Sequence, residues 1–132
     1  QEHIAVLKRY APDLPPVLGT RQELEQVLLN LLVNAWHAMP SGGTITIMTE
    51  RRDAQALIAI TDTGCGIPEE HMSRLFEPFF TTKSPEQGTG LGLAVAHQLI
   101  TGHGGRIDIA SQVNQGTTIR MTLPLAEGGQ DA

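Results

Sequence analysis

Hydrophobic residues recur with a helical period over residues 20–39. Apolar side chains at positions 24, 27, 28, 31, 32, 35 and 39 keep a spacing of three to four residues. The pattern ends at Pro40-Ser41-Gly42-Gly43, where proline and glycine disfavour helix. At the other end, Thr20 and Glu23 have the spacing of a capping box. The sequence therefore predicts a long helix that begins at Thr20 and ends before Pro40.

Other segments alternate between apolar and polar residues with a period of two, which is typical of strands. Strands are predicted at residues 4–7, 44–49, 56–60, 106–111 and 117–123, with turns at 51–53 and 114–116. A short helix is expected from Pro68 to Phe76, because proline is tolerated in the first turn. A further apolar helix is expected at residues 91–100.

Five strands and three helices, mostly in adjacent hairpins, favour an α/β (α+β) two-layer sandwich over a doubly wound fold. We expect a mixed, mostly antiparallel sheet with the helices on one face and solvent on the other. Residues 77–90 carry two prolines, two glycines and no sustained period. Loops of this length are uncommon inside a domain unless they serve a ligand, so this segment is expected to be a lid.

Length and composition exclude several classes of protein. The 132 residues suit one domain, and a formal charge of −5 without a basic cluster argues against a nucleic-acid partner. The single Cys65 cannot form an internal disulfide, and no metal-ligand spacing occurs. No apolar run is long enough to cross a bilayer, so no direct membrane contact is expected. A chain without an initial Met and with the polar ending EGGQDA is expected to be the C-terminal piece of a cytoplasmic protein.

The long helix carries one polar stripe. An α-helix turns about 100° per residue, so the polar side chains on it fall within roughly 40° of one line: Glu23, Gln26, Asn30, Asn34 and His37. Because Leu29, Val33 and Trp36 make the remaining surface apolar too, the helix is expected to be buried almost all round except at this stripe. A single buried Asn commonly bonds to the backbone of a neighbouring loop. Several aligned polar positions favour a ligand site instead.

Two glycine loops accompany the stripe. Asp62-Thr63-Gly64-Cys65-Gly66-Ile67 directly follows a strand, and its carboxylate can accept a hydrogen bond from an amino group, although a plain turn explains such a motif as well. Gly88-Thr89-Gly90-Leu91-Gly92-Leu93 opens a helix, where backbone N–H groups and the helix dipole favour phosphate. The second loop matches neither the dinucleotide fingerprint nor the P-loop. Together the two loops and the stripe predict a nucleotide site.

Four segments resemble the N, G1, F and G2 boxes of the sensor histidine kinase catalytic domain, in that family's order: QVLLNLLVNAWHAM, DTGCGI, RLFEPFFTTK and GTGLGLAVAHQLI. The resemblance covers nearly the whole chain. It implies membership of the GHKL superfamily, which also holds type II topoisomerases, mismatch-repair ATPases and chaperone ATPases. It further implies the Bergerat-type sandwich that binds ATP with Mg²⁺, with the catalytic and ATP-binding domain at residues 1–126 and a polar tail at 127–132.

By position, the resemblance assigns roles to individual residues. Asn34 would coordinate Mg²⁺, Asn30 would support the phosphates and the metal, and Asp62 would accept from the adenine amino group. Lys83 would join Asn30 and Asn34 as a catalytic residue. The base and the phosphates would be contacted by a larger set: Ala38, Gly64, Gly66, Ile67 and Thr117 near adenine, and His37, Thr82, Lys83, Gly88, Thr89, Gly90, Leu91, Gly92 and Leu93 near the phosphates. At His37 many histidine kinases carry Lys or Arg.

The resemblance also implies a reaction. ATP-hydrolysing relatives carry a Glu one turn before the metal-binding Asn, and here that position is Asn30, which cannot take a proton from water. The γ-phosphate would instead go to a histidine on the dimerisation domain of the same kinase, and then to an aspartate on the receiver domain of a response regulator. That phosphoacceptor domain is absent from this chain, which is expected to be monomeric by itself within a dimeric bacterial kinase.

Three alternatives remain open. An ATP-driven clamp would need a water-activating carboxylate, and a nucleotide-sensing docking module would bind ATP without any acceptor. A serine kinase of the anti-sigma type would share the ATP site. The ending Thr122-Leu123-Pro124-Leu125 and the run FEPFFTTK fit sensor kinases better than that last alternative.

Overall fold

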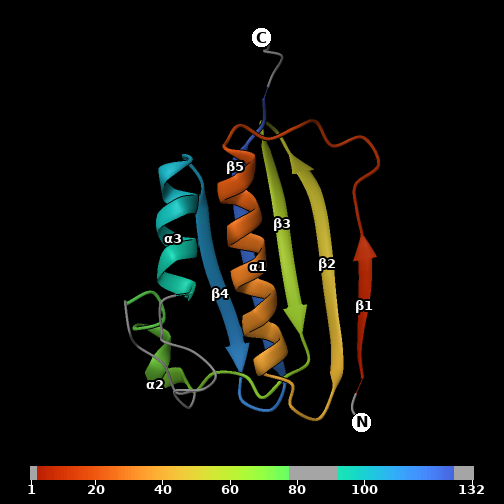
Figure 1. The fold of residues 1–132 in the computed structure, drawn as a ribbon, viewed down its shortest axis with the longest axis vertical. Coiled ribbons are helices and arrows are strands. Elements are labelled where there is room, and N and C mark those ends of the chain that lie inside the picture. Colours follow the sequence, from red (N-terminus) through yellow and green to blue (C-terminus); the bar gives the residue numbers. More distant parts are fainter. Residues whose placement is uncertain (1–2, 78–91, 127–132) are drawn as a thin grey trace.

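The computed structural model describes residues 3–77 and 92–126. Its strands form one sheet in the order β1-β2-β3-β5-β4 (Figure 1). The first strand pairs in parallel with the second, and the other pairings are antiparallel. The strand bounds are β1 (Ile4–Arg9), β2 (Gly43–Arg52), β3 (Gln55–Asp62), β4 (Arg106–Gln112) and β5 (Gly116–Pro124). The predicted mixed, mostly antiparallel sheet is therefore confirmed.

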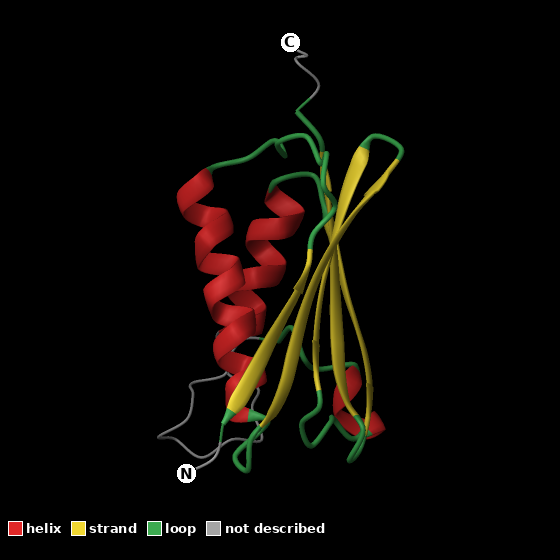
Figure 2. Cartoon of the chain, turned by 90° about the vertical axis from the view of Figure 1, so that its right-hand side faces the viewer, coloured by secondary structure: helices red, strands yellow, loops and turns green. Residues whose placement is uncertain are grey.

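The two longer helices lie side by side on one face of this sheet (Figure 2). These are α1 (Arg21–His37) and α3 (Gly92–Gly102), while α2 (Glu69–Met72) is a single turn near the end of β4 (Figure 1). Alternate residues of the strands face the helices and build an aliphatic core. Its largest fully buried side chains are Val27, Leu31, Ile100, Met121 and Leu123. The structure thus has the expected two-layer α/β architecture.

Neither of the two longer helices lies against the opposite face of the sheet, and α2 lies only at its foot, near the end of β4 (Figure 2). Side chains here alternate with the core-facing set, and many of them are polar. Thr61 of β3 and Thr118 of β5, which lie opposite one another, share a hydrogen bond of 3.0 Å between their hydroxyl oxygens on this face. The expectation of one solvated face agrees with this arrangement.

The N-terminus of α1 differs from the predicted capping box. Thr20 occupies the N-cap position, but its side chain makes no cap hydrogen bond. Its backbone N–H donates to Nε2 of His103 at 3.0 Å, while Nδ1 of the same ring lies 2.7 Å from the Leu99 carbonyl oxygen. The imidazole therefore takes the acceptor role predicted for Glu23, whose carboxylate lies 3.7 Å from Nε2. Only the packing of α3 beside α1 makes this replacement possible.

The expectation that α1 is buried almost all round is wrong. Leu29, Val33 and Trp36 are 55%, 37% and 60% exposed. These side chains share one side of the helix, because they are four and three residues apart. The helix has the sheet beneath it and α3 on one flank, so its outer side has no described neighbour (Figure 2). Apolar residues in a helix do not by themselves reveal how many layers cover it.

The short helix also ends earlier than predicted, at Met72 rather than Phe76. Beyond it the chain continues as i→i+3 turns, in which Arg74 N–H donates to His71 O and Glu77 N–H donates to Arg74 O. Such turns keep nearly the spacing of a helix without its hydrogen-bond pattern. The ring of Phe76 stacks on His97 of α3 at 4.6 Å between centroids, which fixes this segment against the helix layer.

Two leucines on α1 allow a matched test of the core. Leu31 is fully buried, whereas Leu29 is more than half exposed. We expect Leu31→Ala to lower the free energy of unfolding by about 2–5 kcal/mol, and Leu29→Ala to change it by no more than about 0.5 kcal/mol. Chemical denaturation measures both values. Equal losses in the two variants would contradict the described orientation of α1.

Candidate functional site

The loop that follows β3 packs directly on the C-terminal end of α1. Cys65 N–H donates to the carbonyl oxygen of Ala38 at 3.0 Å. A side chain at Gly64 would overlap that oxygen, and its Cβ would lie 2.8 Å from Ala38 Cβ. Gly64 is therefore required for the close approach of the two backbones, and Ala38 takes part through its carbonyl group. The first glycine loop therefore contacts the C-terminal end of α1, the helix that carries the polar stripe, as the sequence predicted.

The other side of this loop contacts the β4–β5 turn. Gly66 has a φ of +75°, and a Cβ there would lie 2.6 Å from the carbonyl carbon of Gln112. Asn114 N–H in the turn donates to Cys65 O at 2.7 Å. Residues 62–67 are thus held between α1 and the β4–β5 turn, with no room for side chains at the two glycines.

Asp62 is a buried carboxyl group in this site, only 5% exposed. Its Oδ1 accepts a hydrogen bond from Gly64 N–H at 2.8 Å, and the backbone N–H of Thr117 also donates to the carboxylate. Burial raises the pKa of Asp62 above its ordinary value of 3.8, because desolvation penalises the charged form more than the two N–H donors stabilise it. An ionised Asp62 is a buried acceptor, ready for a donor group.

Ser111 joins the parts of this site, and sequence reasoning missed it. Its hydroxyl oxygen accepts from Ile67 N–H at 2.8 Å and donates to Gly116 O at 2.9 Å. The hydroxyl of Thr117 lies 2.8 Å from the same oxygen. One signal was available: Ser111 continues the core-facing series of Ile107 and Ile109, and a polar residue there needs partners.

The polar stripe of α1 is brought to the second glycine loop. Asn30 Nδ2 donates to the carbonyl oxygen of Gly92, the first residue of α3, at 3.2 Å. Its Oδ1 accepts from Gln26 Nε2 at 2.8 Å. Asn30 thus bonds to the backbone of a neighbouring segment, as a buried Asn commonly does. This contact lies at the point where the phosphates are predicted to bind. Asn34 and His37 are part-buried on the same stripe, and the ring of His37 stacks on Trp36 at 5.7 Å.

Several predicted phosphate contacts lie outside the described residues: Thr82, Lys83, Gly88, Thr89, Gly90 and Leu91. Gly92 and Leu93 are described, and Leu93 packs its side chain against the core. No group of three or more His, Cys, Asp or Glu side chains that could hold a metal occurs within residues 3–77 and 92–126. A magnesium ion held partly by substrate phosphates needs only one or two protein oxygens, so the amide oxygen of Asn34 suits it.

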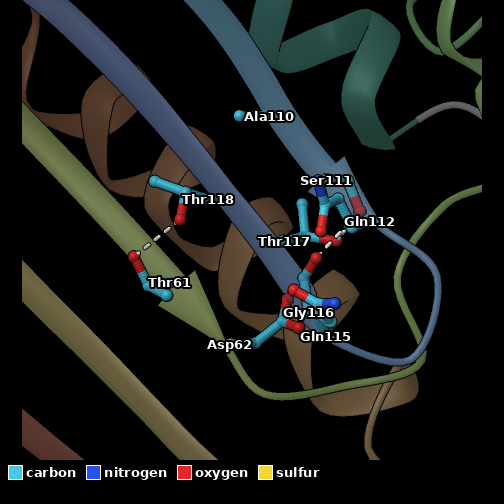
Figure 3. Close-up of a pocket in the computed structure, with 9 residues that line it drawn as sticks. All are labelled: Thr61, Asp62, Ala110, Ser111, Gln112, Gln115, Gly116, Thr117 and Thr118. Carbon is cyan, nitrogen blue, oxygen red and sulfur yellow. Dashed lines mark hydrogen bonds between the residues drawn. The ribbon is translucent and has the colours of Figure 1, made fainter.

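A shallow cavity lies on the other side of the sheet (Figure 3). Thr61, Ala110 and Thr118 line it, and α1 is seen behind the strands in this view. Asp62, Ser111 and Thr117 also line it, although Asp62 and Thr117 occupy positions on the helix-covered face, in register with the core residues Ile60 and Ile119 (Figure 3). The cavity therefore adjoins the predicted nucleotide site at Asp62 and Thr117, while another part of that site falls on residues 78–91.

Residues 19–127 match the family described as histidine kinase-, DNA gyrase B- and HSP90-like ATPase. Sporulation kinase E of Bacillus subtilis (strain 168) is 40% identical over 120 residues, which cover 90% of this chain and 16% of that kinase. This chain therefore spans about a sixth of the length of that relative.

Solved structures share the fold. A mycobacterial sensor histidine kinase, MprB, superimposes with a TM-score of 0.82 at 32% identity, over 92% of this chain and 82% of that one. Full-length ShkA in complex with AMPPNP superimposes with a TM-score of 0.80 at 27% identity, over 93% of this chain and 26% of that one.

Gly66 and Gly102 offer a matched pair of substitutions. Gly66→Ala places a Cβ against Gln112 at a φ that costs an L-residue about 1–2 kcal/mol, so we expect a loss of stability larger than that range. Gly102→Ala meets nothing within 4 Å in a helix, where alanine is favoured by about 0.5–1 kcal/mol. Thermal unfolding distinguishes them. A Gly66→Ala protein as stable as Gly102→Ala would contradict the described seating of the loop.

The raised pKa of Asp62 has a consequence for stability. The folded state holds this proton more tightly than the unfolded state, so the contribution of Asp62 is full below about pH 3.8 and is lost as the pH rises through the folded pKa. Asn at this position does not titrate. We expect Asp62→Asn to gain stability relative to wild type as the pH rises from about 4 to 7. Denaturation at a series of pH values measures this, and a pH-independent difference would contradict it.

Proposed function

The chain belongs to the family of histidine kinase-, DNA gyrase B- and HSP90-like ATPases, and on that premise we propose that it binds Mg·ATP and transfers the γ-phosphate to a histidine. The acceptor histidine lies on the dimerisation domain of the same two-component kinase, and the phosphate passes from there to an aspartate on a response regulator receiver domain. Similarity to sensor histidine kinases along most of the chain favours this member of the family over the clamp ATPases.

The observation that carries the proposal is the hydrogen bonding of the Asn30 side chain. Its Oδ1 accepts from Gln26 within α1 and its Nδ2 donates to Gly92 O at the start of α3, so both functional groups of the amide are engaged in hydrogen bonds. An amide cannot act as a general base towards water. Within the described part of α1, the stripe holds one carboxylate, Glu23, near the opposite end of the helix from Asn34. Water is therefore poorly activated, which favours transfer to a nucleophile that arrives from another domain.

The base would be recognised at the other end of the site. A buried Asp62 accepts well from an exocyclic amino group, and Thr117 lies beside it on the neighbouring strand. Gly64, Gly66 and Ile67 form the loop that follows Asp62, and this loop is held between α1 and the β4–β5 turn at the edge of the proposed base site. The related full-length ShkA is described in complex with AMPPNP, an ATP analogue, which supports the same choice of ligand for this chain.

Phosphoryl transfer depends mainly on position and on neutralisation of charge. The amide oxygen of Asn34 would hold Mg²⁺, which when bound neutralises charge on the phosphates. Asn30 positions the first residue of α3, an 11-residue helix whose N-terminal end favours anions. The predicted contacts of Thr82, Lys83 and residues 88–91 with the phosphates, and of His37, complete the proposed site.

The reaction would take place in the cytoplasm, where ATP and the receiver domain are available. No helix among the described residues is long and apolar enough to cross a membrane. The parent kinase is proposed to be dimeric, because the acceptor histidine belongs to a dimerisation domain.

Transfer is tested with this chain and a kinase fragment that carries the dimerisation domain, supplied in trans or fused in cis. We expect acid-labile phosphohistidine to form on the fragment, and Asn34→Ala to reduce its rate by about 100-fold or more. Gln22→Ala, an exposed change on the same helix, serves as the control and should leave the rate unchanged. Radiolabelled ATP with acid and base treatment of the product measures the transfer.

Two results would contradict the proposal. Tight binding of Mg·ATP without transfer to any supplied domain would indicate a nucleotide-sensing module. Steady hydrolysis by the isolated chain, abolished by substitution of Asn30, would indicate an ATP-driven clamp.

A further inference from the structure

Three side chains form a row across the sheet at its nucleotide end. Ser111 of β4 lies opposite Thr117 of β5, which in turn lies opposite Asp62 of β3. Directly opposed residues on neighbouring strands present their side chains on the same face, here the face covered by the helices. Thr117 is 7% exposed and Asp62 is 5% exposed. Ser111 is part-buried. Water has little access to Asp62 and Thr117, so their hydrogen bonds must be satisfied within the row or by a ligand.

The hydroxyl of Ser111 has one hydrogen and two lone pairs, and its three neighbours use all of them. Ile67 N–H can only donate, so it occupies one lone pair, at 2.8 Å. The carbonyl oxygen of Gly116 can only accept, so it takes the hydrogen, at 2.9 Å. The third neighbour, Thr117 Oγ1 at 2.8 Å, then faces the remaining lone pair. Thr117 must therefore donate its own hydrogen to Ser111.

This arrangement determines what Thr117 can offer to a ligand. With its hydrogen bound to Ser111, the Thr117 hydroxyl has only lone pairs left. The carboxyl group of Asp62 beside it already accepts from Gly64 N–H and is an acceptor as well. A ligand at this end of the site must therefore present donors. Adenine carries an amino group on its six-membered ring, whereas guanine and hypoxanthine carry a carbonyl oxygen at the same position, which would meet acceptors.

We infer that Ser111 is a positioning residue that fixes Thr117 as an acceptor and so contributes to the preference of the site for an amino-substituted purine. The inference rests on the proposed function, since it concerns the base of the bound nucleotide. Ser111 itself acts through Thr117 and Ile67. No contact between Ser111 and the base is required.

The test compares affinities for ATP and for inosine triphosphate (ITP), which carries a carbonyl oxygen in place of the amino group. In Ser111→Ala the Thr117 hydroxyl is free to turn and donate, and Ile67 N–H loses its acceptor. We expect the ratio of ATP to ITP affinity to fall by about five- to tenfold, since one directed hydrogen bond changes role. Ser111→Thr, which retains the hydroxyl, should restore the ratio. Competition with a fluorescent nucleotide measures both affinities.

A matched control lies next to Thr117 on the same strand. Thr118 also shares a hydroxyl–hydroxyl bond across the sheet, to Thr61 at 3.0 Å, but on the opposite face (Figure 3). Thr118→Val removes that bond without touching the row. It should leave the ATP to ITP ratio unchanged even where it lowers the melting temperature. Thr117→Val removes the acceptor itself while Ser111 is retained, and it should also lower the ATP to ITP ratio. This second variant tests the inference even where Ser111→Ala folds poorly.

Distinct results separate the inference from the proposed function. Equal weakening of ATP and ITP in Ser111→Ala or in Thr117→Val would show a purely structural role and overturn the inference. A wild-type chain that binds neither nucleotide would overturn the proposed function instead. A wild-type chain that binds ATP and ITP equally would overturn the inference and leave phosphate transfer intact.

Discussion

The close backbone approach of residues 64–67 to their two neighbours is the constraint on which the rest of the site depends. On one side, the Ala38 carbonyl at the end of α1 accepts from Cys65 N–H. On the other, Gly66 meets Gln112 of β4 where no side chain would fit. These contacts join the helix layer, the end of β3 and the β4–β5 turn into one rigid end of the sandwich. Asp62, Thr117 and the polar stripe of α1 are positioned by it.

Burial gives this end of the sheet its chemical character. Asp62 and Thr117 are the two buried polar residues within residues 3–77 and 92–126, and they lie opposite one another on adjacent strands. The Asp62 carboxylate accepts from the N–H groups of Gly64 and Thr117, and the Thr117 hydroxyl shares its hydrogen bond with Ser111. Lone pairs on both side chains remain for a ligand. A buried acceptor pair of this kind is costly without a donor, and a nucleotide base would supply one.

Helix α1 has three different sides. One side packs on the sheet and α3, a second carries the polar stripe, from which Asn30 bonds to the start of α3, and a third exposes Leu29, Val33 and Trp36. The first side attaches α1 to the rest of the core, and the second positions the start of α3 through Asn30. A helix that is apolar over most of its surface is thus compatible with a two-layer fold, because its third side faces away from both the sheet and α3 (Figure 2).

The sequence by itself determined the elements and the residue types of the site, because these depend on local period and turn chemistry. The helical spacing over residues 20–39, the strand alternation and the two glycine loops predicted α1, five strands and a nucleotide site at Asn30, Asn34 and Asp62. Tertiary structure alone decided the order β1-β2-β3-β5-β4 and the pairing of His103 with the α1 cap in place of Glu23. It also decided the exposed side of α1 and the three hydrogen bonds of Ser111. Each of these joins residues that are distant in sequence or depends on which neighbours cover a surface, and local patterning carries no information about such partners.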